Sequence, residues 1–468
     1  MATSQTDRFS DPTGLHRAFL ESPRQHVLMI TNHGIHQWHI IPGLPDTGGQ
    51  NVFVNQFTAT LAKLGFRVTV ANRGGYPHPV TGQPRRGLHY QDEHQRILYL
   101  EDDVGQFVRK EDMNTRIPTL VGFLSAFLDA EGTPVDLIVS HYWDGAQVGA
   151  LYNRSREERV THVWVPHSLG AIKKRNVPPA RWSELRIDER IAIEEALVRR
   201  VDAIAATSPI ISEALEEDYG YAREPLFLPP CVDTDRYHPR DVARDHAIWS
   251  FLGERAGTSP EDVRGRRIVT EISRTDTTKR KDVLLKAFAR ARDGVPDSLL
   301  VVSIDEKEEE LSGELTGLMR TLDLRGSVAP VGTIWDRLPM VYAVTDVYCT
   351  PSIMEGFGMS AQEAAATGVP IVASDRVPFA TEYLLGKSPD EIFVEGSDRP
   401  LKVGEGAVVV PADHVEGFAH ALEMLLLDDE RRKAMGKRAL ELTVPAFTWQ
   451  KRVSDFLDAL DLEGPRPA

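Results

Sequence analysis

The 468-residue chain has few cysteines, few aromatic residues and no long apolar run. Its two cysteines, Cys231 and Cys349, exclude a disulfide framework and fit a reducing compartment. No apolar stretch approaches the roughly 18 residues that a membrane-spanning helix needs, so we expect no membrane span. The first residues, Met1 to Asp7, are polar and contain no apolar signal region, which predicts a cytoplasmic protein.

Positively charged residues are outnumbered by negatively charged ones. Lysine and arginine number 54 against 69 aspartates and glutamates, which gives a net charge of −15. This balance argues against general nucleic-acid binding. Together with the polar N-terminus it also argues against an enzyme of the membrane surface that acts on a lipid. The 41% of hydrophobic residues is typical of a soluble protein, and the length suggests about three domains or two large α/β domains.

Strand and helix signals alternate twice along the chain. In the first half, the pattern predicts strands at 26–30, 67–71, 97–100, 135–139, 162–165 and 202–206, and helices at 50–64, 115–129 and 184–200. In the second half, it predicts strands at 267–273, 298–303, 327–331, 344–349, 371–374 and 407–410. Such alternation predicts parallel sheets with helices on both faces, in two Rossmann-like domains that face a central cleft.

The most informative stretch runs from Pro351 to Pro370, where a loop and a helix from about Ser360 connect two strands. Glu355 lies in the loop and Glu363 in the first helical turn. Loops of this kind lie at the carboxyl end of a parallel strand, where open α/β sheets bind ligands. Carboxylates suit hydroxyl donors, and free amides at a helix start suit phosphate, which together predict a sugar joined to a phosphate. The amides in question belong to Gly356, Phe357, Gly358 and Met359.

Each motif also has a structural interpretation. Ser360 and Glu363 have the spacing of a helix capping box. Arg274 and Lys279 follow a strand and suit a diphosphate, but they could form a solvated basic turn. The Gly48-Gly49 pair at a helix start could cradle a phosphate or only form a turn.

Strands that end in His141-Tyr-Trp-Asp144 and Pro166-His-Ser-Leu-Gly170 suggest one edge of a cleft, although single histidines are commonly structural. Asp233 and Asp235 resemble paired metal ligands, but no carboxylate cluster stands near them in the sequence, so we predict a linker and no metal site.

Taken together, these motifs resemble the retaining nucleotide-sugar glycosyltransferases of family 4, which have the two-domain GT-B fold. The resemblance spans about residues 26–460. It is carried by the Glu-Gly-Phe-Gly motif with Glu355 and Glu363, by Arg274 with Lys279, by Gly48-Gly49 and by His167. Asn32-His-Gly34, Pro45 to Gln50, His141 to Asp144, Lys173 and Arg190 resemble the branch of sucrose-phosphate synthase, sucrose synthase and mannosylfructose-phosphate synthase.

The resemblance implies a role for each matching residue. An acceptor-binding domain would span 1–235, with the terminal helix 447–462 packing back onto it, and a nucleotide-sugar-binding domain would span 236–446. Catalysis would involve His167, Glu355, Arg274 and Lys279. Donor binding would involve Gly48, Gly49, Arg274, Lys279, Glu355, Gly356, Phe357, Gly358, Met359 and Glu363. Acceptor binding would involve Gln50, His141, Asp144, Lys173 and Arg190.

The expected reaction moves a hexose, glucose or mannose, from a UDP-, GDP- or ADP-sugar to a small polar acceptor such as a sugar phosphate, in carbohydrate or compatible-solute metabolism. No cofactor or metal would be required, although Mg²⁺ could stimulate the reaction, and a homo-oligomer stays open. A glycerate-type acid could also be the acceptor, because Lys173, Lys174, Arg85 and Arg86 also suit a carboxylate. The same motifs would also fit a nucleotide-sugar epimerase, a phosphorylase with pyridoxal phosphate or a nucleotide-sugar sensor.

The chain departs from the family pattern in places. Arg274 lacks the proline that often follows it, and Ser374 to Pro378 replaces a usual glycine pair. The loop 72–90 and the segment His36 to His39 have no assigned role. Because several departures lie where the acceptor would bind, the sequence predicts the reaction class better than the acceptor.

Overall fold

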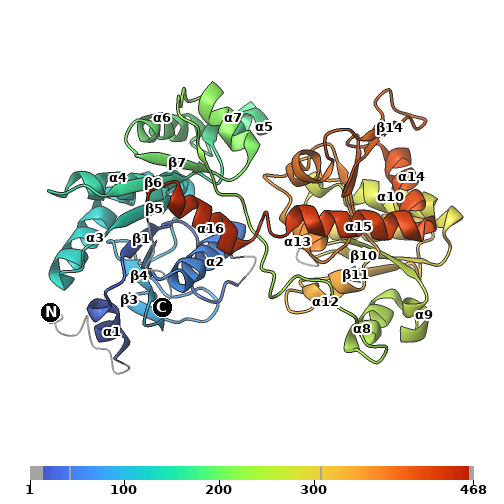
Figure 1. The fold of residues 1–468 in the computed structure, drawn as a ribbon, viewed down its shortest axis with the longest axis horizontal. Helices are drawn as coiled ribbons and strands as arrows, with labels where there is room; N and C mark the ends of the chain where they lie inside the picture. The colour runs from blue at the N-terminus through green and yellow to red at the C-terminus, as the bar shows by residue number, and fades with distance from the viewer. Residues whose placement is uncertain (1–13, 42–43, 306–307, 463–468) are drawn as a thin grey trace. The chain divides into compact units, whose positions relative to one another are not determined.

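The computed structural model describes residues 14–41, 44–305 and 308–462, which form two compact units. The first unit consists of the described residues up to Pro229 together with those from Trp449 onward, and the second runs from Pro230 to Thr448. Each unit is built around one eight-stranded sheet (Figure 1). The predicted α/β class with two Rossmann-like domains is therefore confirmed. Among the described residues, no helix combines the length and the apolar character that crossing a membrane requires.

The first sheet is parallel except at one edge. In spatial order its strands are β3 (Gly87–Asp92), β4 (Gln95–Leu100), β2 (Arg67–Arg73), β1 (His26–Ile30), β5 (Leu137–His141), β6 (Thr161–Val165), β7 (Ala203–Ala206) and β8 (Leu226–Phe227). Of these strands, only β3 runs antiparallel, beside β4. The unit's helices are α1 (Leu15–Glu21), α2 (Gly49–Lys63), the 3₁₀ helix η2 (Lys110–Arg116), α3 (Ile117–Glu131), α4 (Tyr142–Arg154), α5 (Gly170–Asn176), the 3₁₀ helix η3 (Pro179–Arg181), α6 (Ile187–Val198), α7 (Pro209–Glu217) and α16 (Trp449–Asp458).

Alternate residues of the central strand β1 serve opposite faces of this sheet. Leu28 and Ile30 belong to the apolar cluster formed with α3 and α4. Met29 points the other way, where the Thr58 hydroxyl of α2 donates to its sulfur at 3.1 Å. Because side chains alternate along a strand, a strand that is covered on both faces is mostly apolar, and β1 is buried along its whole length with His26 as its one polar residue.

The stretch 72–90, for which the sequence predicts no role, forms a hairpin-like excursion. β2 continues to Arg73, Pro77 and Pro84 form an isolated antiparallel bridge, and β3 then pairs with β4. The predicted helix 184–200 is shorter than expected and begins at Ile187, because Arg186 before it takes a left-handed conformation with φ 47°.

The second unit is also built around a sheet whose strands are mainly parallel. In spatial order its strands are β11 (Val328–Val331), β10 (Ser298–Ser303), β9 (Arg267–Glu271), β12 (Val347–Thr350), β13 (Ile371–Ser374), β16 (Ala407–Val410), β15 (Leu401–Val403) and β14 (Asp390–Ile392). The helices are α8 (Ala247–Ala256), α9 (Pro260–Arg264), the 3₁₀ helix η4 (Thr277–Lys279), α10 (Lys281–Gly294), α11 (Glu309–Thr321), α12 (Leu338–Ala343), α13 (Met359–Ala366), the π-helix η5 (Phe379–Leu384), α14 (Val415–Leu427) and α15 (Asp429–Thr443).

The last helix, α16, belongs to the first unit and contacts α2. Trp449 begins α16 and donates from Nε1 to Oε1 of Gln56 at 2.8 Å. Its ring lies edge-on to Phe53, with the ring centroids 4.8 Å apart. These contacts tie the end of the chain to the helix that begins at Gly49.

Replacing Trp449 by alanine should lower the free energy of unfolding by about 3–5 kcal/mol, because a large buried ring leaves a cavity and Gln56 loses its partner. Urea unfolding followed by circular dichroism measures this loss. Trp335→Ala is the control, since that side chain is 40% exposed and should cost much less. Equal losses in the two variants would contradict the anchoring role of Trp449.

Candidate active site

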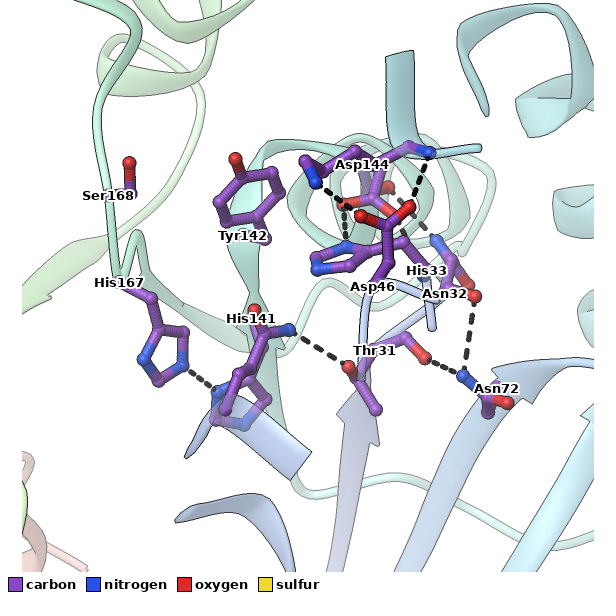
Figure 2. A network of polar contacts seen from close by, with 12 residues as sticks. Thr31, Asn32, His33, Asp46, Asn72, His141, Tyr142, Asp144, His167 and Ser168 are labelled. Carbon is purple, nitrogen blue, oxygen red and sulfur yellow. Dashed lines mark hydrogen bonds and ion pairs between the residues drawn. The ribbon is translucent and has the colours of Figure 1, made fainter. Parts of the chain in front are cut away.

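The strand order of the first sheet reverses at β1, which lies between β2 and β5. From β1 the chain passes through α2 to β2 on one side, and it later returns through α3 to β5 on the other. The carboxyl ends of β1 and β5 therefore flank a crevice, and doubly wound sheets bind ligands at such a point. Figure 2 shows the polar side chains that gather there.

Two residues at this edge hold a backbone conformation that favours glycine. Tyr142, directly after β5, has φ 64°, and His167, shortly after β6, has φ 58°. Such conformations cost about 1–3 kcal/mol each and are concentrated at ligand sites. In this conformation the chain turns sharply where each strand ends. The two strained residues therefore lie at the same edge of the sheet at which the strand order predicts a ligand site.

The predicted site histidines His141 and His167 contact each other. Nδ1 of His141 lies 2.9 Å from Nε2 of His167 (Figure 2). Burial, assisted by the charge of His33, lowers the pKa of His167 to about 3. Burial and then the neighbouring His167 hold the pKa of His141 well below its usual value. Both rings are therefore neutral at pH 7, and a neutral imidazole can exchange hydrogen bonds with a sugar hydroxyl.

The other acceptor-site predictions at this edge have different surroundings. Gln50, in the first turn of α2, donates from Nε2 to the Thr31 hydroxyl at 3.1 Å. Asp144 is fully buried, and its carboxylate accepts from both Nδ1 and the backbone amide of His33. Gly48 and Gly49 are exposed at the start of α2, with open space where a Cβ of Gly48 would stand. A ligand can therefore approach the backbone of this glycine pair.

A cavity rich in cations adjoins this edge. Arg190 donates from Nε to Glu194 at 2.7 Å, from Nη1 to the Tyr142 hydroxyl at 2.5 Å and from Nη2 to the Ser168 carbonyl at 2.6 Å. Lys173, which the sequence predicted together with Arg190, faces Glu111 at 3.6 Å. The cavity is lined by Lys110, Glu111, Tyr142, Trp143, Lys173, Leu185, Arg186, Glu189, Arg190 and Ile193. It brings four cations and two carboxylates to one place.

Burial lowers the pKa of Lys173, and the nearby charges of Arg190 and Lys110 act in the same direction against the opposing effect of Glu111. The ammonium group of Lys173 is therefore partly removed from water, close to two other cations and to the Glu111 carboxylate. An anion bound beside it would raise its pKa again.

The sequence missed Lys110, Tyr142 and Arg186 as site residues. Lys110 lies in the short helix η2 and forms an ion pair with Asp46, and no motif surrounds it in the sequence. Of these three residues, only Tyr142 could have been found from the sequence, because it lies between His141 and Asp144, directly at the end of a predicted strand.

Arg85 and Arg86, proposed from the sequence as carboxylate partners, do not have the predicted surroundings. Arg85 is only 2% exposed, and its guanidinium lies 4.7 Å from the Tyr76 ring centroid and 4.8 Å from that of Tyr99. Its Nη2 donates to the side chain of Asn72. Arg86 pairs at the surface with Glu101 at 3.3 Å.

The second sheet reverses its order at β9, which lies between β10 and β12. The loops after β9 and β12 supply Lys279 and Glu355, whose Nζ and Oε1 atoms are 2.6 Å apart. Arg274 is not drawn into this pair: its side chain is 85% exposed and lies 3.6 Å from Asp276. Two of the predicted catalytic residues of this unit, Lys279 and Glu355, are thus in contact. The side chain of the third, Arg274, is exposed and does not join them.

The turn before α13 is held by side-chain packing and by a hydrogen bond from the Phe379 amide to the Phe357 carbonyl at 2.8 Å. Phe357 is buried against Phe379, Tyr383 and Phe447. Gly358 is the N-cap of α13 at φ 109°, and a Cβ there would lie 2.8 Å from Cγ1 of Val377. Only glycine meets both conditions. Gly356 has open space around it, so a ligand can reach this turn.

The capping-box interpretation of Glu363 is wrong. The cap is Gly358 and no side chain caps the helix. The Glu363 carboxylate instead accepts from the Tyr342 hydroxyl at 3.4 Å. Burial raises the pKa of Glu363 to about 7, against the opposing effects of the Arg236 charge and of hydrogen bonds from Tyr342 and Tyr237. The side chain of Glu363 therefore has no capping role, and two tyrosine hydroxyls hold its carboxyl group.

Asp233 has a structural role of its own, because its Oδ1 accepts the backbone amides of Asp235 and Arg236 at 3.1 and 3.3 Å. Within the described ranges, no three His, Cys, Asp or Glu side chains gather in a way that could hold a metal ion.

Two family models match the chain, one on each unit. Residues 47–236 match "Glycosyltransferase Family 4", and residues 259–442 match "Glycosyl transferases group 1". The two matches include the glycine pair at 48–49 in the first unit and the two glutamates at 355 and 363 in the second, whereas β1 precedes the first match.

Individual proteins show the same likeness. The chain is 28% identical over 386 residues to mannosylfructose-phosphate synthase of Agrobacterium fabrum, covering 80% of this chain and 78% of the relative. It is 29% identical over 425 residues to D-inositol 3-phosphate glycosyltransferase of Corynebacterium jeikeium, covering 87% and 90%. The structure of sucrose-phosphate synthase from Thermosynechococcus elongatus superposes with a TM-score of 0.72 at 22% identity, covering 94% of this chain and 98% of that one. The predicted GT-B fold is confirmed by this likeness.

Replacing Glu363 by glutamine should raise the melting temperature at pH 8 and leave it nearly unchanged near pH 4.5. The folded-state pKa of about 7 lies above the ordinary value of 4.5, so the fold favours the protonated carboxyl. That preference is fully present below the unfolded pKa and is lost as the pH rises through the folded pKa. Glutamine stays neutral and keeps an oxygen for Tyr342.

Melting curves between pH 4.5 and pH 8 measure the effect. Glu355→Gln is the matched control, because it removes the partner of the buried Lys279 and should destabilise the protein across the whole range. A melting temperature of Glu363→Gln that differs from wild type by the same amount at every pH would contradict the raised pKa.

Proposed function

Because the chain belongs to the glycosyltransferases described by the family 4 and group 1 models, we propose that it is a retaining hexosyltransferase with a phosphorylated, polyhydroxylated acceptor. The hexose, glucose or mannose, comes from a nucleotide-diphosphate sugar. The single observation that supports this acceptor class is the cation-rich cavity beside the β1–β5 crevice.

The donors of the cavity suit a phosphate better than a carboxylate. Lys110, Lys173, Arg186 and Arg190 line it, and the Tyr142 hydroxyl adds a neutral donor. One guanidinium can satisfy a carboxylate through two parallel hydrogen bonds, whereas a phosphate offers three oxygens and up to two charges. Both sequence relatives are named after a phosphorylated compound. Mannosylfructose-phosphate synthase is named after its product, and D-inositol 3-phosphate glycosyltransferase is named after its substrate.

The second unit supplies what a nucleotide-diphosphate sugar needs. Lys279 and the extended Arg274 would hold the diphosphate, and Glu355, oriented by its ion pair with Lys279, would bind a hydroxyl of the hexose. Glu363 would bind the ribose hydroxyls in place of the Tyr342 hydroxyl. The open turn at Gly356 lets the diphosphate and sugar approach the amides before α13.

In the proposed reaction, the bond between the anomeric carbon and the diphosphate oxygen breaks as an acceptor oxygen bonds to the same face of that carbon. The acceptor proton passes to the departing phosphate oxygen. Because the new bond forms on the face from which the diphosphate leaves, the anomeric configuration is retained. Lys279 and Arg274 stabilise the charge that develops on the diphosphate. The neutral His167 bonds the hexose near its anomeric end, and Glu355 and Glu363 position the donor without protonating it.

The test is the release of nucleoside diphosphate from UDP-, GDP- and ADP-linked glucose and mannose. Each donor is incubated alone, with fructose 6-phosphate, with D-inositol 3-phosphate, and with glycerate. We expect release to depend on a phosphorylated acceptor. Release that depends on glycerate instead would refute the phosphate assignment, release without any acceptor would favour an epimerase, and donor binding without release would favour a sensor.

Replacing Lys173 by alanine should raise the KM for the phosphorylated acceptor about tenfold or more and change the donor KM little, because one charge-assisted hydrogen bond is lost. Lys174→Ala is the matched control. The neighbouring Lys174 pairs with Asp188 at 2.6 Å and lies over Trp182, outside the cavity lining. Equal acceptor KM values for the two variants would contradict the role of Lys173.

A further inference from the structure

A buried ion pair in the second unit joins the two ends of the loop that carries Arg274 and Lys279, and no role assigned above uses it. Glu271 is the last residue of β9, and Lys281 is the first residue of α10. Their side chains are 0% and 1% exposed, and Nζ of Lys281 lies 2.5 Å from Oε2 of Glu271. The loop between them, residues 272–280, is called the donor loop below, and it begins and ends at this ion pair.

The Lys281 ammonium group also ties the donor loop to the neighbouring strand β10. Its Nζ donates to Oγ of Ser273 at 3.1 Å and to Oγ of Ser303, the last residue of β10, at 3.0 Å. The Ser303 hydroxyl donates to the Ser273 carbonyl at 2.5 Å and accepts from the Ser273 amide at 2.9 Å. An ammonium group has three N–H donors, and the carboxylate and the two hydroxyls use all of them. Lys281 therefore holds the loop and has no donor left for a ligand.

Both predicted diphosphate ligands lie in the donor loop, close to the points at which it is held. Arg274 directly follows Ser273, whose hydroxyl donates to the Arg274 carbonyl at 3.2 Å. Lys279 lies two residues before Lys281, and its Nζ is 2.6 Å from Oε1 of Glu355. The position of each cation therefore depends on where the ends of the loop are fixed.

The donor loop is also joined to the turn that carries Glu355. The backbone amide of Ile353 donates to the Thr278 carbonyl at 2.9 Å, and the Ser352 hydroxyl donates to the same carbonyl at 3.3 Å. A shift of the donor loop would therefore also displace the residues just before Glu355.

Stability alone does not explain the pair. Oε1 of Glu271 is buried and makes no hydrogen bond to any residue that the structure describes. Burial lowers the pKa of Lys281 against the opposing effect of Glu271, and the nearby charge of Lys279 adds to the lowering. An apolar pair of similar volume commonly gives a fold equal or greater stability than a buried ion pair does. The pair is therefore better explained by the geometry that it imposes on the donor loop.

We propose that Glu271 and Lys281 are positioning residues of the transfer reaction, whose ion pair fixes the donor loop so that Lys279 and Arg274 can hold the diphosphate of the nucleotide sugar. The inference rests on the proposed function. Neither residue touches the substrate, and both act through the two cations of the loop. A displacement of about 1 Å in a catalytic group can lower a rate about a hundredfold, so a pair that only fixes a loop can have a large effect.

Calorimetric titration with UDP, GDP and ADP tests the proposal. The double variant Glu271→Leu/Lys281→Met replaces the pair by apolar side chains, so that no buried charge is left without a partner and the melting temperature should not fall. With the nucleoside diphosphate that binds the wild type most tightly, we expect the Kd to rise about fivefold or more and the acceptor KM to change less than about twofold.

The matched control is Arg96→Met/Glu131→Leu. These two residues form an equally buried ion pair in the first unit, with side chains 0% and 1% exposed and Nη2 of Arg96 2.6 Å from Oε2 of Glu131. Its replacement can change the melting temperature but should leave the Kd for the nucleoside diphosphate unchanged. An equal rise in Kd in the control would overturn the inference, because loss of any buried pair would then have the same effect.

The effect should also depend on Lys279, because the pair acts through the donor loop. In a Lys279→Ala background, Glu271→Leu/Lys281→Met should raise the Kd by a smaller factor than in the wild type, since one of the two groups that it positions is already absent. The same factor in both backgrounds would overturn the inference.

If the double variant does not fold, Ser303→Ala decides. This change keeps the ion pair and removes the hydroxyl that joins Lys281 to Ser273, and the Kd should rise about threefold or more. A smaller rise than expected in the deciding variant overturns the inference while the proposed function stands. A wild-type protein that binds none of the three nucleoside diphosphates overturns both.

Discussion

In each unit, the strand order of a parallel sheet reverses at one strand, and this reversal decides where ligands can bind. At β1 and at β9, the connections to the two neighbouring strands leave in opposite directions, so no helix closes over the ends of the paired strands. The backbone groups there need partners, and polar side chains at the strand ends supply them. In the first unit, the Asp144 carboxylate accepts from the His33 backbone amide, and in the second unit the side chains of Lys279 and Glu355 pair with each other.

Buried or partly buried cations near both crevices are paired with carboxylates. Lys279 pairs with Glu355 in the second unit, and Lys173 faces Glu111 in the first. A cation that is partly removed from water and has no partner would strongly destabilise the fold. The ion pairs therefore stabilise the protein when no ligand is bound. A bound phosphate must compete with these carboxylates, which lowers affinity but strengthens the preference for a doubly charged ligand over a singly charged one.

Strand and helix existence could be predicted from apolar periodicity, because both sheets are buried on both faces. The helix ends could not. Glu363 stood at capping-box spacing from Ser360, yet Gly358 is the cap, because the packing of the Phe357 ring places the turn two residues earlier. The sequence pattern around Arg85 is that of a surface cation, but the ring faces of Tyr76 and Tyr99, distant in the sequence, enclose it. The surroundings of a single side chain such as that of Arg85 depend on tertiary contacts, which the spacing of residues along the sequence does not encode.

Residue spacing in the sequence is also more informative for one part of the candidate site than for the other. The residues predicted to bind the donor cluster in three short motifs, because loop and helix-start positions supply the amides, cations and carboxylates that a diphosphate and a sugar require. The cation-rich cavity instead draws Lys110 from η2, Tyr142 from α4, and Lys173 and Arg190 from α5 and α6. Such a cavity can change one lining residue without altering a motif. The residues that line this cavity are therefore brought together by the packing of four helices, which the spacing of residues in the sequence does not reveal.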